Sequence, residues 1–132
     1  ALRVESPPVG RTQIAQLAFD PAPDAGTSRG FVFLEITDGG ALALVEQASG
    51  AEVNRVGVAI PLASSWQVLE LGLDRDAGKL FAGDGANTSF SLLVSGAHGS
   101  LVEARVGVSD ATPRPSGTTD LLYDEVVVTI RR

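Results

Sequence analysis

The side chains of this chain that can take part in chemistry are few in type and number. Its 132 residues include one histidine, one tryptophan, one tyrosine and no cysteine. Without cysteine there is no thiol nucleophile, disulfide or Cys-based zinc cluster, and the lone His98 excludes a two-histidine metal site. Sixteen acidic residues against ten basic ones give a net charge of −6. We expect no nucleic-acid partner, because phosphate binding needs clustered cations.

His98 is the one residue around which a nucleophilic triad can be composed. Ser95 or Ser100 would supply the hydroxyl, and Asp110 or Asp120 the orienting carboxylate. Neither serine lies in a G-x-S-x-G turn, the turn that exposes a nucleophilic serine, however. A surface position in the Gly/Ser-rich loop 95–100 is the favoured interpretation of His98, with ligand contact as the alternative to catalysis.

Asp74 and Asp76 form a D-x-D-x-G pattern with Gly78 that superficially resembles a calcium loop. An EF-hand loop needs glycine at its sixth position and glutamate at its twelfth. Here Gly78 stands at the fifth position and Gly85 at the twelfth. The pattern therefore predicts a hairpin turn that begins with aspartate.

Trp66 is the candidate for contact with a carbohydrate, because a flat ring covers the apolar face of a sugar. It follows Ser64-Ser65 and opens an alternating segment, so it can lie at the rim of a domain. The competing interpretation is a half-buried core residue, which the usual burial of large aromatic side chains favours.

The segments that must position these residues are short and alternate between apolar and polar residues, which predicts strands. They comprise 13–20, 31–37, 41–46, 52–60, 66–74, 79–82, 89–94, 101–108 and 121–130. The turn Asp38-Gly39-Gly40 predicts a hairpin between the second and third of them. No segment sustains a helical period, so we expect one all-β domain over 1–132, an antiparallel two-sheet β-sandwich.

The four-residue pattern Arg-Val-Gly-Val occurs twice, at 55–58 and at 105–108. The similarity does not extend clearly into the flanking residues, as it would in a tandem repeat. The pattern indicates either chance or two equivalent strands of one sandwich.

The order of motifs in the second half of the chain resembles that of concanavalin A-like (laminin G-like) domains. Residues 66–74 read W-x-V-L-x-L-x-x-D, a short strand ends in Asp84-Gly85, and residues 122–128 form an aromatic-Asp-acid-Val closing run. The resemblance spans roughly residues 60–132 and, more loosely, 13–46. It implies a jelly-roll fold. The E-x-D-x-E catalytic strand of the glucanases of this fold is missing, so we expect no enzyme.

The resemblance also implies a role for Asp124, because an aspartate at this place in the closing strand can bind a structural calcium ion. Calcium takes six to eight oxygen ligands, so backbone carbonyls and water must complete the site. Residues 5–8 can approach from the other end of the chain. The alternative is an Asp124 side chain that points outward, opposite to Tyr123.

From these features we expect a non-catalytic binding or adhesion module of an exported protein, secreted or at the cell surface, with a glycan or protein ligand. The loops 20–30, 95–100 and 109–120 are the expected binding edges. The alternative is a structural protein that packs against itself or against a partner chain. The sequence has no run of about 18 apolar residues, so we expect no membrane-spanning segment.

Overall fold

The computed structural model describes residues 1–4, 10–21, 28–37, 40–74, 77, 79–84, 88–93, 98–110 and 121–124. These residues form ten β-strands and no helix, so the protein is all-β. The strands are β1 (Leu2–Val4), β2 (Thr12–Pro21), β3 (Gly30–Ile36), β4 (Leu42–Ala48), β5 (Ala51–Val58), β6 (Glu70–Asp74), β7 (Lys79–Gly83), β8 (Thr88–Leu93), β9 (His98–Asp110) and β10 (Leu121–Tyr123).

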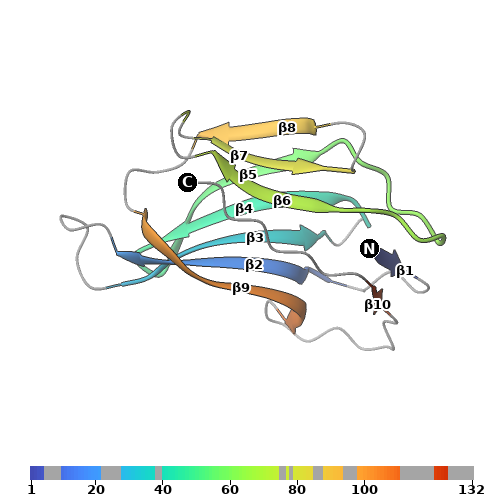
Figure 1. Cartoon of the computed structure of the whole chain (residues 1–132), viewed down its shortest axis with the longest axis horizontal. Coiled ribbons are helices and arrows are strands. Elements are labelled where there is room, and N and C mark those ends of the chain that lie inside the picture. Colours follow the sequence, from blue (N-terminus) through green and yellow to red (C-terminus); the bar gives the residue numbers. More distant parts are fainter. Residues whose placement is uncertain are drawn as a thin grey trace.

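The largest unit is a five-stranded antiparallel sheet in the order β5-β4-β3-β2-β9 (Figure 1). Its first four strands follow one another along the chain as a meander, and β9 then joins the free side of β2. Strands β6, β7 and β8 form a second antiparallel sheet, and β1 pairs with β10. These smaller sheets and the five-stranded sheet share one buried apolar cluster, which gives the molecule a sandwich-like character.

The buried cluster explains the alternation in β3, whose Val32, Leu34 and Ile36 all point into it. Leu2 and Val4 reach the same cluster from β1, and Leu80 and Ala82 reach it from β7; the cluster is built from aliphatic residues and Phe19. The other face of β3 carries Phe31 and Phe33, whose rings stack with their centroids 5.9 Å apart. Both faces of this central strand are thus largely buried, as its nearly continuous apolar sequence requires.

The predicted hairpin between the second and third segments is confirmed as β3 and β4, which pair from Phe31–Gln47 to Ile36–Leu42. Thr37 donates a backbone hydrogen bond to the carbonyl of Ala41, and Gly40 adopts a φ of 75°. This is the positive φ that the glycine-rich turn sequence predicts. Residues 38 and 39 lie outside the described residues.

The segment expected as one strand over 66–74 is regular from Glu70 onward. Its predicted alternation is correct: Leu69, Leu71 and Leu73 pack against the core, whereas Val68 and Glu70 are exposed. The first part of the segment pairs elsewhere, since Gln67 forms a bridge with Leu2. At the far end, Asp74 accepts a hydrogen bond from the backbone of Ala77, as expected of a turn that begins with aspartate.

The last strands differ from the prediction in their bounds. Strand β9 begins at His98 and continues to Asp110, so residues 98–100 and 109–110 are strand rather than loop. In the expected loop 20–30, residues 20–21 belong to β2 and residue 30 begins β3. Residues 22–27, 95–97 and 111–120 of the three expected binding loops lie outside the described residues. So does most of the expected closing strand, of which β10 is the described part.

The repeated Arg-Val-Gly-Val pattern marks the two edge strands of the five-stranded sheet, β5 and β9. Arg55 pairs with Val45 and Arg105 pairs with Gln16, and Phe33 pairs with both of those residues. The two arginines therefore lie in one row across the sheet. Of the two interpretations of the repeated pattern, this arrangement fits two equivalent strands of one sandwich.

Candidate functional site

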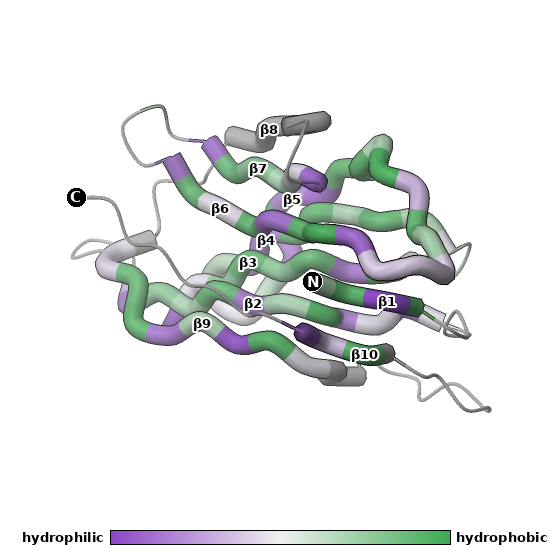
Figure 2. Tube along the Cα trace, turned by 45° about the vertical axis from the view of Figure 1, so that its right-hand side comes forward, coloured by the Kyte–Doolittle hydropathy of each residue, from purple (hydrophilic) through white to green (hydrophobic). Residues whose placement is uncertain are grey.

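A small surface forms where the start of the chain, its closing strand and the segment before β6 meet. Leu2 pairs with Tyr123 in the β1–β10 ladder, and it exchanges two backbone hydrogen bonds with Gln67, of 2.8 and 2.9 Å. Figure 2 shows β1 and β10 side by side. Three chain segments that are distant in sequence thus run next to one another.

Alternation along these segments divides their side chains between two faces. Leu2, Val4 and Tyr123 face the core, so their neighbours Arg3 and Leu122, which pair with each other, face outward. Because Gln67 pairs with Leu2, antiparallel geometry places Trp66 beside Arg3 on that outward face. We call the set Arg3, Trp66, Val68, Leu122 and Asp124 the Trp66 surface.

The Trp66 surface combines exposed apolar side chains with charged ones. Trp66 is 47% exposed, Val68 50% and Leu122 41%, and all three are among the large apolar residues that the core does not cover. Arg3 carries the opposite charge to Asp124. Trp66 is thus about half-buried, but it is not among the residues that pack against the buried cluster, because the bridge at Gln67 turns its neighbour Trp66 away from the core.

The side chain of Gln67 fixes the loop that carries Trp66. Its Oε1 accepts a hydrogen bond of 2.8 Å from the backbone of Ala63, and its Nε2 donates one of 3.1 Å to the carbonyl of Pro61. The side chain of Gln67 thus forms hydrogen bonds within the loop 61–67, while its backbone forms hydrogen bonds with Leu2. Trp66 is presented by a braced loop, which favours a preformed binding surface.

Asp124, the candidate calcium ligand, follows β10 and is exposed. Its backbone amide donates to the carbonyl of Ala1 at 3.0 Å, and the Ala1 amino group donates to its carbonyl. The beginning of the chain does lie beside Asp124, therefore, although the expected carbonyl donors, residues 5–8, lie outside the described residues. Within the described part of the chain, no group of three or more acidic or histidine side chains is arranged to hold a metal ion.

His98 is not part of the Trp66 surface. Its backbone begins β9 and is opposite Pro21, at the end of β2. Trp66 thus lies in the loop beside β1, whereas His98 begins a strand of the five-stranded sheet. Of the two serines of the disfavoured triad, Ser95 lies outside the described residues and Ser100 is in β9; Asp110 is at the opposite end of β9 from His98.

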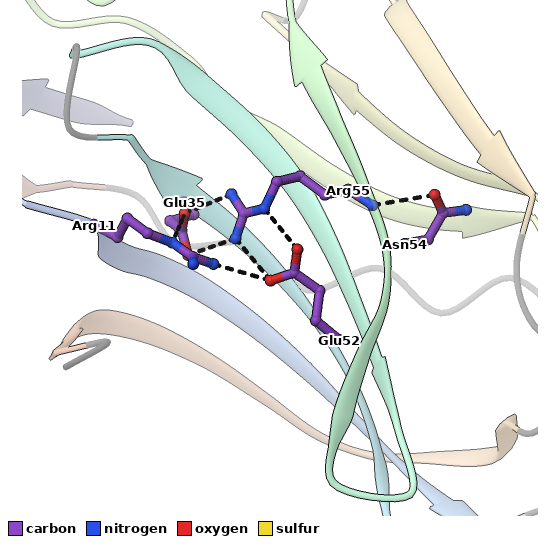
Figure 3. A network of polar contacts seen from close by, with 5 residues as sticks. All are labelled: Arg11, Glu35, Glu52, Asn54 and Arg55. Carbon is purple, nitrogen blue, oxygen red and sulfur yellow. Dashed lines mark hydrogen bonds and ion pairs between the residues drawn. The ribbon is translucent and has the colours of Figure 1, made fainter.

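A second polar feature, which the sequence did not reveal, lies on the outer face of the five-stranded sheet. Arg11 and Arg55 each contact both Glu35 and Glu52 (Figure 3). Arg55 Nη1 is 2.8 Å from Glu35 Oε1, and Arg11 Nε is 3.0 Å from the same atom. The alternation of 31–37 indicated the face of Glu35, but long-range pairing brings the arginines to it.

Glu35 is fully buried at the centre of this cluster. Burial raises the pKa of its carboxyl group above the ordinary value, an effect that outweighs the opposing influence of Arg11; the charge of Glu52 raises the pKa further. The arrangement places two carboxylates between two guanidinium groups. Its charge-assisted hydrogen bonds join β3, β5 and Arg11, the residue before β2.

Comparison with known proteins returned no match to a family model, to a curated protein or to a solved structure. Within the part of the chain that the structure covers, no helix has the length and apolar character to cross a membrane.

Proposed function

We propose that this protein is a non-catalytic carbohydrate-binding module built on a concanavalin A-like β-sandwich, and that the Trp66 surface is its binding site. The observation that carries the proposal is the outward position of Trp66 between exposed apolar and charged neighbours. The indole ring would stack on the apolar face of a sugar, and Arg3 and Asp124 would hydrogen-bond to hydroxyl groups at its edges.

A binding role agrees with the chemistry of the acidic residues better than catalysis does. The glycosidases that use two carboxylates need one as a proton donor and the other free to attack or to activate water. Glu35 and Glu52 each accept hydrogen bonds from two arginines instead. Export to the cell surface or the medium would bring such a module to glycans.

A glycan array probed with purified protein, with and without calcium, tests the proposal. We expect the wild type to bind a defined set of glycans, and Trp66→Ala to lose most of that binding, because the stacking surface is removed. Trp66→Phe should retain part of it. Val53→Ala is the matched control, since Val53 is 49% exposed on β5, away from the Trp66 surface.

Two array results would contradict the proposal. One is the lack of any bound glycan under both conditions, and the other is equal binding by the wild type and Trp66→Ala. The melting temperature gives a separate test of calcium at Asp124, because an ion that binds the folded state raises it by mass action. We expect a rise with calcium that Asp124→Asn removes; an unchanged melting temperature would contradict a calcium site.

A further inference from the structure

Strand β9 is a long edge strand with exposed apolar side chains. It spans thirteen residues along the border of the five-stranded sheet, where it pairs with β2 on one side (Figure 1). Among the described residues, no strand pairs with its other side. Val102 and Val106 are each 44% exposed. The backbone amide and carbonyl groups along an edge strand are a template for pairing with another strand.

The sequence of β9 is complementary to itself when two copies run antiparallel. Ala104 is the middle residue of His98–Asp110 and lies within residues 103–106, which pair regularly with β2, so a two-fold axis at Ala104 places this stretch antiparallel to itself. In this register Val102 is opposite Val106 of the second copy. Glu103 is opposite Arg105 of the second copy, and by symmetry the same pair forms again on the other side of the axis.

The charged pair is available for such a contact. The Arg105 side chain is 64% exposed and that of Glu103 is 33% exposed, and within one chain the two form an ion pair along the strand. Pairing two copies would set each side chain against an opposite charge across the interface as well. Opposite charges that face each other across antiparallel strands are stabilising, and like charges are destabilising.

We propose that two copies of this chain associate through β9, which joins their five-stranded sheets into one continuous ten-stranded sheet. The occupant of the edge is thus a second copy. The inference does not depend on glycan binding, because the Trp66 surface is formed around β1 and β10, whereas β9 belongs to the five-stranded sheet.

Charge reversal provides the test, with sedimentation velocity over a range of concentrations as the measurement. The wild type should shift from monomer to dimer as its concentration rises. Glu103→Arg and Arg105→Glu each place like charges opposite each other at both symmetric positions, and each should weaken the dimer about tenfold or more. An equimolar mixture of the two variants should dimerise again, because each chain then presents the charge that the other lacks.

The mixture separates the interface from effects within one chain. Either single variant also breaks the ion pair inside its own strand, and mixing cannot restore that pair. A wild type that stays monomeric at high concentration would overturn the proposal. This is the result expected if another segment of the same chain occupied the edge. Dimerisation that both single variants retain, or a mixture that stays monomeric, would overturn it too. Unchanged melting temperatures of the variants at low concentration serve as the folding control.

Discussion

The hydroxyl group of Tyr123 donates a hydrogen bond of 3.3 Å to the backbone carbonyl of Ile14, across 109 residues of sequence. Ile14 lies at an irregularity of β2, where the register shifts against both β3 and β9 between Gln13 and Ala15. Ladder partners on both sides thus skip this residue. Tyr123 provides a hydrogen bond to its carbonyl and at the same time ties β10 to the five-stranded sheet.

Tyr123→Phe should lower the free energy of unfolding by about 1 kcal/mol, because the ring remains while the hydrogen bond to the Ile14 carbonyl is lost. Urea denaturation followed by circular dichroism measures the change. An unaltered unfolding midpoint would mean that water satisfies the carbonyl equally well.

The protein should lose stability in alkali through the same residue. Burial raises the pKa of Tyr123 from about 10 to about 12. The folded state therefore retains the phenol proton more tightly than the unfolded state. The stabilisation is complete below about pH 10 and disappears as the pH rises through about 12. Because the chain has one tyrosine, phenolate absorbance reports this group directly. A titration midpoint near 10 in the folded protein would refute the prediction.

The contribution of Glu35 to the free energy of unfolding, measured against a variant with a neutral side chain at this position, should be larger in acid than at neutral pH. Since burial raises the pKa of Glu35, its contribution is complete when the carboxyl is protonated and diminishes as the pH rises through that pKa. We expect the stability difference between the wild type and Glu35→Gln to shift toward the variant as the pH rises above about 4, where an ordinary glutamate ionises. Glu70→Gln, at an exposed position of β6 outside this cluster, is the control. A shift toward the wild type would mean that the arginines outweigh burial.

Gly72 and Gly57 should respond oppositely to alanine. Gly72 pairs with Phe81 across β6 and β7, and a Cβ at Gly72 would overlap the Phe81 ring. Gly72→Ala should therefore cost about 1 kcal/mol or more. A Cβ at Gly57 in β5 meets open space, so Gly57→Ala should be neutral or stabilise by up to about 1 kcal/mol.

A double-mutant cycle identifies the cause of the Gly72 effect. In a Phe81→Ala background, Gly72→Ala should cost much less, because the ring that it displaces is gone. If Gly72→Ala destabilises the wild type and the Phe81→Ala variant equally, the loss of stability arises from the backbone and not from the Phe81 ring.

The sequence predicted the local features of this fold better than the long-range ones. Alternation in 31–37 and the Asp-Gly-Gly turn predicted the β3–β4 hairpin, because both signals lie within a few residues. Alternation along 66–74 puts Trp66 on the same face as Val68 and Glu70, but it carries no trace of the bridge between Gln67 and Leu2, which are 65 positions apart.

The polar cluster was missed for the same reason. Glu35 has apolar residues as its sequence neighbours, and the arginines that contact it are 24 and 20 residues away. Asp124 was singled out by its place in the closing strand, and the structure adds its backbone contact with Ala1. The calcium ion itself remains a prediction.

Fluorescence of Trp66 during a titration with a soluble glycan that binds the wild type tests the central claim most directly. The chain has one tryptophan, so its emission reports the proposed site and no other. In the free protein, emission should be red-shifted and readily quenched by acrylamide, as for a water-exposed indole. Addition of the glycan should shift the emission to the blue and protect it from acrylamide, with the same dissociation constant that calorimetry gives. Calorimetric binding that leaves both properties unchanged would contradict a site at Trp66.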